Sequence, residues 1–359
     1  MKIYVIIPVF DAVEYLKQAV DSVLEQDFRN LEIVLVDDGS VDGSSDLCDA
    51  LKDAHENIHV IHQKNGGVSI ARNTGINFVN ELASGECEAF DESYVTFLDS
   101  DDVWIENSIS EEDTELFDKR YDLIGFQSCE ANSVLSRRSQ PVSMAEGKYT
   151  GGRNAECLFN LQHFGAMLYN LAFLKNYNLR FYPMCYSEDK IFRTQALYLA
   201  GTIFLENRLF YVYRQNRFSA MHRRPYGILY YQPVIDGWLQ SDHDMEKWRN
   251  KERGILEIGT VRAKRYLIYM MEEHFQYGGT AREWNRLLEN RQEYQNLLKD
   301  DTIGDPLTLK ALVGYEKQPV KYRIYNRLYG IVMRAAKKIL KSKVLRARIE
   351  KRKYPIKMG

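Results

Sequence analysis

The sequence has few cysteines, and their spacing builds neither a disulfide framework nor a zinc site. The five cysteines are odd in number, and no two of them form a C-x-x-C pair. No run of about 18 apolar residues is present, which is the length that a membrane-spanning helix needs. The first residues contain too short an apolar run for a signal peptide. These absences predict a reduced, cytoplasmic chain without a membrane span.

Length and charge describe what is present. The 359 residues suffice for one large domain with extensions or for two domains, and 45% of them are hydrophobic. Residues 319–359 carry a net charge of +13, whereas the rest of the chain carries −15. This split predicts a basic tail that has an anionic partner.

The first hundred residues alternate between apolar runs and amphipathic segments. The runs predict strands at residues 3–9, 32–36, 58–62 and 94–98. A helix is predicted after Asp11, which forms a capping-box pattern with Glu14, and two more are predicted at residues 44–54 and 65–79. This alternation predicts a Rossmann-like α/β layer, in which helices flank a mostly parallel sheet.

Three carboxylates follow the strand at residues 94–98, namely Asp99, Asp101 and Asp102. Alternation along an extended segment places Asp99 and Asp101 on one side of the chain and Ser100 on the other. Two hard oxygen ligands suit Mg²⁺ or Mn²⁺, and a diphosphate would complete the coordination shell. The alternative is an acidic turn without a ligand, because Asp and Ser are common turn residues.

Three polar motifs end neighbouring strands of the predicted sheet. They lie at residues 8–11, 37–40 and 99–101. Ligands of parallel α/β sheets bind at the carboxyl ends of the strands, so the motifs are expected to meet at one edge. Gly66, Gly67 and Arg72 open the helix beside them and favour phosphate, although a plain helix start with a surface arginine is the alternative.

The combined motifs I-I-P-V-F, V-D-D-G-S, N-G-G-V-S-I-A-R-N and F-L-D-S-D-D resemble the family 2 inverting glycosyltransferases of the GT-A fold. The resemblance covers residues 1–220 and implies a UDP-sugar donor. It places these residues at the nucleotide sugar: Pro8, Phe10, Asp38, Asn65, Arg72, Asp99, Ser100 and Asp101. The first three would hold the uracil and its ribose, and the next two would lie near the uracil and diphosphate. Asp99 would contact the ribose and the metal, and Asp101 would be the direct metal ligand.

A second acidic motif, Y-S-E-D-K-I-F, begins at residue 186. Ser187 is predicted to cap a helix whose first turn carries Glu188 and Asp189, and a plain acidic helix start is the alternative. The resemblance implies that Asp189 is the catalytic base, with Glu188 beside it. One carboxylate must accept the proton of the acceptor hydroxyl, while a metal on the opposite side stabilises the departing diphosphate. No Ser-His or Cys-His arrangement competes with this chemistry.

Three stretches deserve separate expectations. Residues 84–93 are longer and more acidic than the family's usual link, which predicts a surface insertion. Residues 164–181 resemble the family's Trp-x-Lys-Leu-Tyr region but lack its Trp and Lys, so a different acceptor pocket is expected. Residues 211–224 resemble a flexible flap, where Arg214 or Arg217 would reach the diphosphate and His222 would contact metal or phosphate. A solvated basic segment is the alternative for the flap.

The predicted organisation has three parts. Residues 1–220 form the catalytic domain, with a nucleotide-sugar part at 1–105 and an acceptor part at 106–220. Residues 221–318 form a helical extension that packs on this domain or on another subunit of a homo-oligomer. Residues 319–359 form a basic amphipathic tail that suits an anionic membrane surface. Docking onto the acidic body and nucleic-acid contact are the alternatives, and an apolar stripe has little use against a phosphate backbone.

The sequence therefore predicts a bacterial-type glycosyltransferase that is peripheral on the inner face of the cell membrane. It would move a sugar from a UDP-sugar, with inversion and with Mn²⁺ or Mg²⁺, to a hydroxyl of a capsular or other cell-envelope polysaccharide or of a lipid-linked oligosaccharide. A nucleotidyltransferase is one alternative, but it should carry a Gly-rich loop with an arginine where residues 8–11 stand. A non-catalytic nucleotide-sugar scaffold is the other, and intact Asp99, Asp101 and Asp189 argue against it.

Overall fold

The computed structural model describes residues 1–84, 92–136, 138–141, 146–151, 163–184, 186–215, 228–246, 248, 258–276, 280–289 and 291–299. The chain divides into two compact units. The first comprises Met1–Arg224 and Asp236–Gly259, and the second comprises Pro225–Ile235 and Thr260–Gly359. The predicted insertion at 84–93 and the tail at 319–359 lie largely or wholly outside the described residues.

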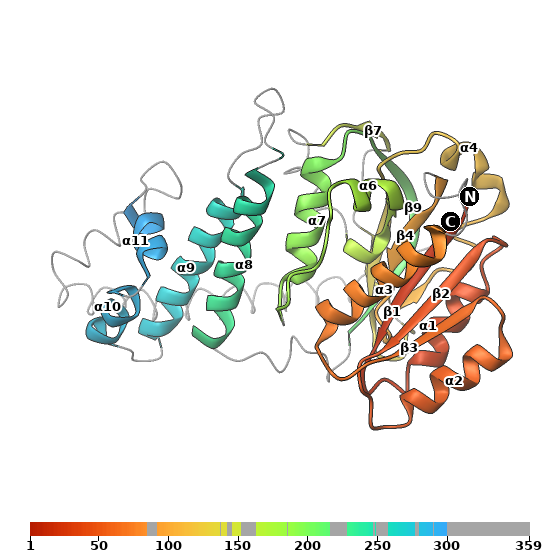
Figure 1. The fold of residues 1–359 in the computed structure, drawn as a ribbon, viewed down its shortest axis with the longest axis horizontal. Helices are drawn as coiled ribbons and strands as arrows, with labels where there is room; N and C mark the ends of the chain where they lie inside the picture. Colours follow the sequence, from red (N-terminus) through yellow and green to blue (C-terminus); the bar gives the residue numbers. More distant parts are fainter. Residues whose placement is uncertain are drawn as a thin grey trace, which may run out of the picture. The chain divides into compact units, whose positions relative to one another are not determined.

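One nine-stranded sheet forms the centre of the first unit (Figure 1). Its strands are β1 (Ile3–Val9), β2 (Leu31–Asp37), β3 (Ile58–His62), β4 (Tyr94–Phe97), β5 (Val103–Trp104), β6 (Leu123–Asn132), β7 (Gly147–Tyr149), β8 (Met167–Asn170) and β9 (Ile203–Gln215). They run in the order β3-β2-β1-β4-β8-β6-β9-β5, and β7 also pairs with β9. The first four strands are parallel, as is the β6–β9 pair, and the other pairings are antiparallel.

Helices cover both faces of this sheet. Those that lie wholly in the first unit are α1 (Leu16–Leu24), α2 (Ser44–Ala54), α3 (Val68–Ser84), α4 (Thr114–Phe117), α6 (Leu171–Asn176) and α7 (Glu188–Leu199). Alternate residues of β1 point to opposite faces, so Val5 packs in the core that contains α1 and α2. Its neighbour Ile6 packs in the core that contains α3, α6 and α7. The predicted α/β layer with a mostly parallel sheet is confirmed.

A close approach between α3 and β1 sets the position of the site. A Cβ on Gly75 of α3 would lie 2.5 Å from Cγ2 of Ile6, so only a glycine fits against the strand here. The approach brings the first turns of α3 to the carboxyl edge of the sheet. It therefore determines where the Gly66-Gly67 loop and Arg72 lie.

Two predicted caps are wrong, although the helices themselves are present. Helix α1 begins at Leu16, because the Asp11 carboxylate accepts the N–H of Val41 at 2.9 Å instead of capping the helix. Helix α7 begins at Glu188 as predicted. Ser187, however, has φ 64° and its side chain makes no capping hydrogen bond. In both places the local pattern located the helix but not the group that satisfies its first amides.

The described part of the second unit consists of helices and their short connections. It contains the first turns of α8 (Ile228–Glu246), nearly all of α9 (Ile258–Gln276), and α10 (Ala281–Glu289) and α11 (Gln292–Lys299). Thr280 and Glu283 cap α10 reciprocally, since each side chain accepts a backbone N–H of the other. Among the described helices, none is both long and apolar enough to cross a membrane.

Candidate active site

The three polar motifs meet at one edge of the sheet, as the sequence predicts. Val9 at the end of β1 is in register with Asp37 at the end of β2. Ile6 of β1 is in register with Phe97, the last residue of β4. The segments that follow these strands, which carry Phe10, Asp38 and Asp99, therefore emerge side by side.

Asp38 anchors the glycine loop at this edge. Its carboxylate accepts the backbone N–H groups of Gly66 and Gly67, both at 2.8 Å, and the side-chain amide of Gln63 at 2.7 Å. Gly67 has φ +88°, a conformation that favours glycine. The Asp38 side chain is buried, whereas Phe10 beside it is 50% exposed. Phe10 thus offers an aromatic face next to a fixed carboxylate.

Two further residues, Pro8 and Asn65, are predicted to contact the nucleotide sugar. Pro8 is buried within β1, where it pairs with Val36 of β2. Asn65 is exposed on the loop before α3. The predicted contacts of Pro8, Phe10, Asp38 and Asn65 with the nucleotide stay predictions.

Arg72 lies inside the protein and not on its surface, because its side chain is only 3% exposed. Its Nη2 donates to Oδ1 of Asp99 at 2.6 Å, and its Nη1 donates to Oε1 of Glu188 at 2.9 Å. The guanidinium also lies 4.6 Å from the ring centre of Phe164 and 5.1 Å from that of Phe181. The surface-arginine alternative is therefore wrong, and the predicted approach of Arg72 to a diphosphate stays a prediction.

The three clustered aspartates have different environments. Asp102 is fully buried and accepts the Tyr211 hydroxyl at 2.5 Å and the Arg214 backbone N–H at 2.7 Å. Burial raises the pKa of Asp102 well above its usual value, and the nearby carboxylates of Asp101 and Asp99 raise it further. Asp99, Ser100 and Asp101 remain partly exposed at the edge. Asp102 is thus a structural carboxylate beneath the two that can face a ligand.

The structure places the side chain of Arg214 inside the domain. Its side chain is buried, and its Nε donates to the carbonyl of Asp101 at 2.5 Å. Its Nη1 and Nη2 donate to the carbonyl of Ser133 and the side chain of Gln18. The Arg214 guanidinium thus joins the segment after β4 to Ser133 and to Gln18 of α1. The prediction that Arg214 or Arg217 reaches the diphosphate stays a prediction. Arg217 and His222 lie outside the described residues.

The predicted base lies close to this cluster. Glu188 and Asp189 occupy the first turn of α7, and Glu188 is buried while Asp189 is partly exposed. Burial raises the pKa of Glu188, the Arg72 guanidinium opposes that rise, and Asp189 adds to it. The pair thus consists of one carboxylate that is fixed by an ion pair and one that can meet a substrate.

Comparison with known proteins identifies the domain. Residues 4–173 match the family model described as "Glycosyl transferase family 2". This part of the chain is a family 2 glycosyltransferase domain.

Curated glycosyltransferases are similar in sequence to parts of this chain, and a solved structure is similar in fold. Glycosyltransferase GlyA of Streptococcus pneumoniae is 44% identical over 110 residues, which are 31% of this chain and 14% of GlyA. The Bacillus subtilis glycosyltransferase EpsJ is 27% identical over 247 residues, which are 67% of each chain. The structure of S. aureus TarS 1–349 in complex with UDP-GlcNAc has a TM-score of 0.61 at 19% identity, over 92% of this chain and 91% of that one. This likeness confirms the GT-A fold, and the chain spans only a small part of GlyA.

One residue of the glycosyltransferase domain near the site was missed by the sequence reasoning. His163 precedes a short 3-10 helix at Phe164–Ala166, and its ring stacks on Tyr211 with centres 4.5 Å apart. Burial lowers the pKa of His163 to about 4, although Asp99 and Asp189 are near enough to oppose this effect. His163 directly precedes the stretch that departs from the family pattern, and that departure was the available indication.

The carboxylate oxygens of Asp99 and Asp101 are of the kind that binds a divalent cation. Within the described ranges, no group of three or more His, Cys, Asp or Glu side chains could hold a metal ion. Asp99 and Asp101 nevertheless supply hard oxygen ligands from one partly exposed segment, and a bound diphosphate would supply others. These two residues would hold the cation, whose chemistry is to stabilise negative charge on a departing diphosphate.

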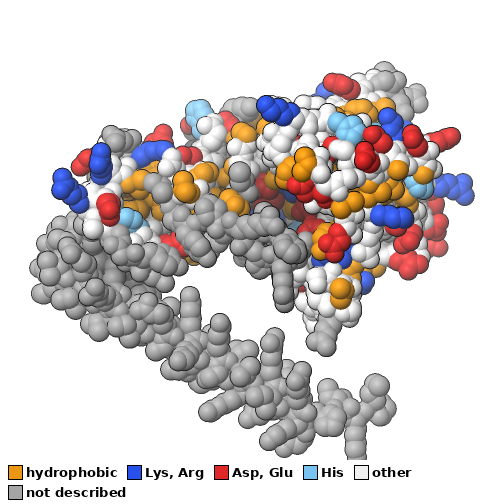
Figure 2. Space-filling view, turned by 90° about the horizontal axis from the view of Figure 1, so that it is seen from below, with side chains coloured by type: hydrophobic (Ala, Val, Ile, Leu, Met, Phe, Trp, Pro, Cys, Tyr) orange, Lys and Arg blue, Asp and Glu red, His pale blue; other side chains and the backbone are white. Residues whose placement is uncertain are grey.

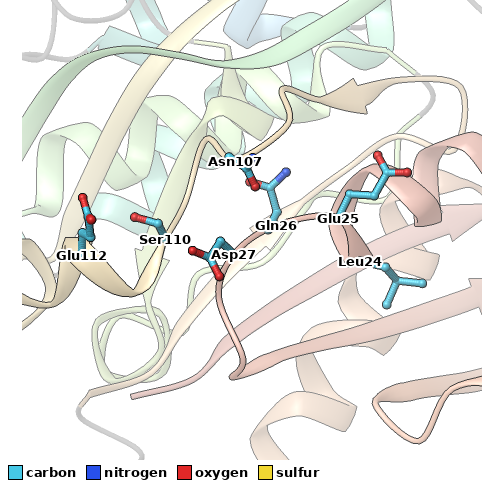
Figure 3. Close-up of a pocket in the computed structure, with 7 residues that line it drawn as sticks. All are labelled: Leu24, Glu25, Gln26, Asp27, Asn107, Ser110 and Glu112. Carbon is cyan, nitrogen blue, oxygen red and sulfur yellow. The ribbon is translucent and has the colours of Figure 1, made fainter.

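A cavity of about 590 Å³ lies elsewhere in the domain (Figure 3). It is lined by Leu24, Glu25, Gln26, Asp27, Asn107, Ser110 and Glu112. Helix α1 ends here and leads into the start of β2, so the cavity is at the amino edge of the sheet. It is separate from the site described above, which lies at the carboxyl edge.

Proposed function

We propose that this glycosyltransferase domain transfers a sugar from a UDP-sugar to an acceptor hydroxyl with inversion. The observation that carries the proposal is the position of Arg72 between Asp99 and Glu188. The buried guanidinium of Arg72 joins the end of β4 to the first turn of α7. The end of β4 suits a nucleotide diphosphate and its metal, and the first turn of α7 suits a base. An inverting displacement needs these two functions on opposite sides of one anomeric carbon.

In the proposed reaction Asp189 accepts the proton of the acceptor hydroxyl. The acceptor oxygen forms a bond to the anomeric carbon as the bond from that carbon to the diphosphate breaks, and UDP leaves with the electron pair. Arg72 holds Glu188 in place, and Glu188 lies beside Asp189 in the same helical turn. Glu188 is therefore assigned a positioning role and Asp189 the proton transfer.

The acceptor is proposed to be a polysaccharide or a lipid-linked oligosaccharide at the inner face of the cell membrane. The charge of +13 in residues 319–359, against −15 in the rest of the chain, supports attachment to an anionic surface. The helical second unit would present or bind the acceptor, or would contact a second copy of the chain. Nucleic acid is not proposed as a partner.

A donor panel tests the proposal. The full-length protein would be incubated with Mn²⁺ and UDP-glucose, UDP-galactose, UDP-GlcNAc or UDP-GalNAc, starting with UDP-GlcNAc because TarS binds it. We expect one donor to be hydrolysed to UDP and to raise the unfolding temperature. A nucleotidyltransferase would instead release pyrophosphate from UTP and a sugar phosphate, and a scaffold would bind a donor without turnover. Failure to bind any of the four would contradict the proposed donor class.

A further inference from the structure

Gly165 lies in the stretch at residues 164–181, where this domain departs from the family pattern, and it packs against Tyr211. A Cβ on Gly165 would lie 2.5 Å from the Tyr211 ring and 2.7 Å from the carbonyl oxygen of Phe97. No larger residue fits at this position while the tyrosine is present. The Tyr211 ring and the Phe97 carbonyl thus occupy the space that a side chain at position 165 would need, and one face of the Tyr211 ring is covered by His163.

Hydrogen bonds connect Tyr211 to Asp99 and Asp102, in the segment that is proposed to bind the sugar nucleotide. The Tyr211 hydroxyl donates to the buried carboxylate of Asp102 and accepts the backbone N–H of Asp99 at 3.4 Å. On the other side of His163, the next residue, Phe164, contacts the guanidinium of Arg72. His163 is therefore fixed between the two groups that position Asp99, and its electrostatic neighbours include Asp189.

The ring of His163 has a defined proton arrangement. Its Nδ1 accepts the backbone N–H of Gly165 at 3.3 Å, so the neutral ring carries its proton on Nε2. Among the described residues, Nδ1 is the only ring nitrogen of His163 with a hydrogen bond. Burial keeps the ring neutral at physiological pH, because its pKa lies near 4. A neutral N–H donor suits a sugar hydroxyl better than it suits a phosphate, which favours cations.

We propose that His163 binds the transferred sugar of the donor, with Nε2–H donating to one of its hydroxyl groups. This inference deepens the proposed function and depends on it. In the proposed reaction the sugar lies between the diphosphate, near Asp99, and the base Asp189, and both carboxylates are near enough to act electrostatically on the His163 ring. His163 would therefore contribute to the choice of sugar, while the uracil and diphosphate are held by other residues.

Paired substitutions separate this role from a structural one. His163→Asn keeps an acceptor for the Gly165 N–H but removes the Nε2–H group that is proposed to bind the sugar. His163→Gln keeps a donor near the position of Nε2. His243→Asn is the matched control, because His243 is 76% exposed on α8. The affinities for UDP and for the four UDP-sugars named above would be measured by titration calorimetry with Mn²⁺.

We expect His163→Asn to bind UDP like the wild type but to bind the UDP-sugar roughly 3- to 10-fold more weakly, the loss of one net hydrogen bond. His163→Gln should retain most of the UDP-sugar affinity, and His243→Asn should retain all of it. Equal affinity of His163→Asn and the wild type for the UDP-sugar would overturn the inference alone. A parallel loss for UDP and UDP-sugar would also overturn it, because the residue would then shape the whole site. A wild type that binds neither UDP nor UDP-sugar would remove the proposed function itself.

Discussion

Arg72 donates a hydrogen bond of 2.9 Å to Glu188 across 116 positions of the sequence. The side chains of Arg72 and Glu188 are 3% and 10% exposed, so the ion pair is almost completely shielded from solvent. Since Arg72 also holds Asp99, the end of β4 and the start of α7 cannot move apart without breaking a buried ion pair. The relationship fixes the segment of Asp99 relative to the first turn of α7. The proposed reaction assigns the metal to the first segment and the base to the second.

Arg72→Met should therefore destabilise the domain as well as inactivate it. Removing one partner of a buried pair leaves an uncompensated charge, which costs roughly 3–5 kcal/mol. We expect the unfolding free energy, measured by urea denaturation, to fall by about 3 kcal/mol. The double variant Arg72→Met/Glu188→Gln should lose less than the sum of the two single variants, because it removes one of the stranded carboxylates. A single Arg72→Met variant as stable as the wild type would mean that the pair is not formed in solution.

Asp189→Asn tests the assignment of the base. The amide keeps the shape of the carboxylate but cannot accept a proton at neutral pH, so kcat should fall on the order of 10²–10⁴-fold. UDP affinity should stay nearly unchanged, since the proposed function places the residue on the acceptor side. Asp46→Asn, in the first turn of α2, controls for the loss of an acid at a helix start.

The opposite pattern would reassign the residue. If Asp189→Asn lost UDP affinity and kept kcat, Asp189 would belong to the donor side. Glu188→Gln would then be the next candidate for the loss of proton transfer. These outcomes are separated by steady-state kinetics together with a direct UDP titration.

Asp101 and Asp102 should differ in what they affect. Asp101→Ala should abolish metal-dependent turnover and weaken UDP binding in the presence of Mn²⁺, with little change in the unfolding temperature. Asp102→Ala should lower the unfolding temperature instead, because it leaves the Tyr211 hydroxyl and the Arg214 N–H buried without their acceptor. A chelator should reproduce the effect of Asp101→Ala on the wild type. Full activity in chelator would remove the metal from the mechanism.

The positions of the strands could be predicted because their apolar runs are local signals. Residues 3–9, 44–54 and 58–62 form the expected elements at the expected bounds. The convergence of the polar motifs also followed from the sequence, since parallel strands place their carboxyl ends at one edge. These local patterns, together with the resemblance to family 2 glycosyltransferases, were sufficient to predict the GT-A fold.

The partners of charged side chains could not be predicted in the same way. The sequence shows that Arg72 and Arg214 are basic residues near polar loops, which suggests anion binding for both. Their actual partners are distant: Arg72 pairs with Glu188 and Arg214 with Gln18. His163 was missed for the same reason, because its stacking on Tyr211 joins segments that are not adjacent in sequence.

His62 at the end of β3 should make stability depend on pH. Its Nδ1 lies 2.9 Å from Oδ2 of Asp37 and its Nε2 lies 3.1 Å from Oδ1 of Asp49. The hydrogen bond with Asp37, followed by the one with Asp49, raises the pKa of His62. The folded pKa therefore exceeds the unfolded value of about 6.5. The stabilisation is fully present below that value and is lost as the pH rises through the folded pKa.

His62→Gln should accordingly lower the unfolding temperature more near pH 6 than near pH 9. The effect should be modest, because the His62 side chain is 43% exposed. Differential scanning calorimetry of the two proteins at both pH values measures it. A difference that stays constant from pH 6 to pH 9 would show that the bonds of His62 do not depend on its charge.

The basic tail should attach the protein to anionic membranes without taking part in catalysis. Each basic residue near an anionic bilayer contributes about 1 kcal/mol, which salt screens, and burial of an apolar stripe adds a part that salt does not screen. Deleting residues 319–359 should leave hydrolysis of the UDP-sugar almost intact but release the protein from anionic vesicles. High salt should weaken the binding of the full-length protein only partly.

Co-sedimentation with vesicles that contain or lack anionic lipid separates the possible roles of the tail. Acidic side chains are prominent on the face of the first unit that Figure 2 shows, so docking of the tail onto the protein itself is the main competitor. Docking predicts that the truncated protein unfolds at a lower temperature, because the net charge of −15 on the remaining residues is then no longer balanced by the basic tail. Membrane attachment predicts an unchanged unfolding temperature and a loss of sedimentation with anionic vesicles alone. Equal sedimentation of both proteins would exclude the membrane role, because the stripe and the charge would then contribute nothing at a bilayer.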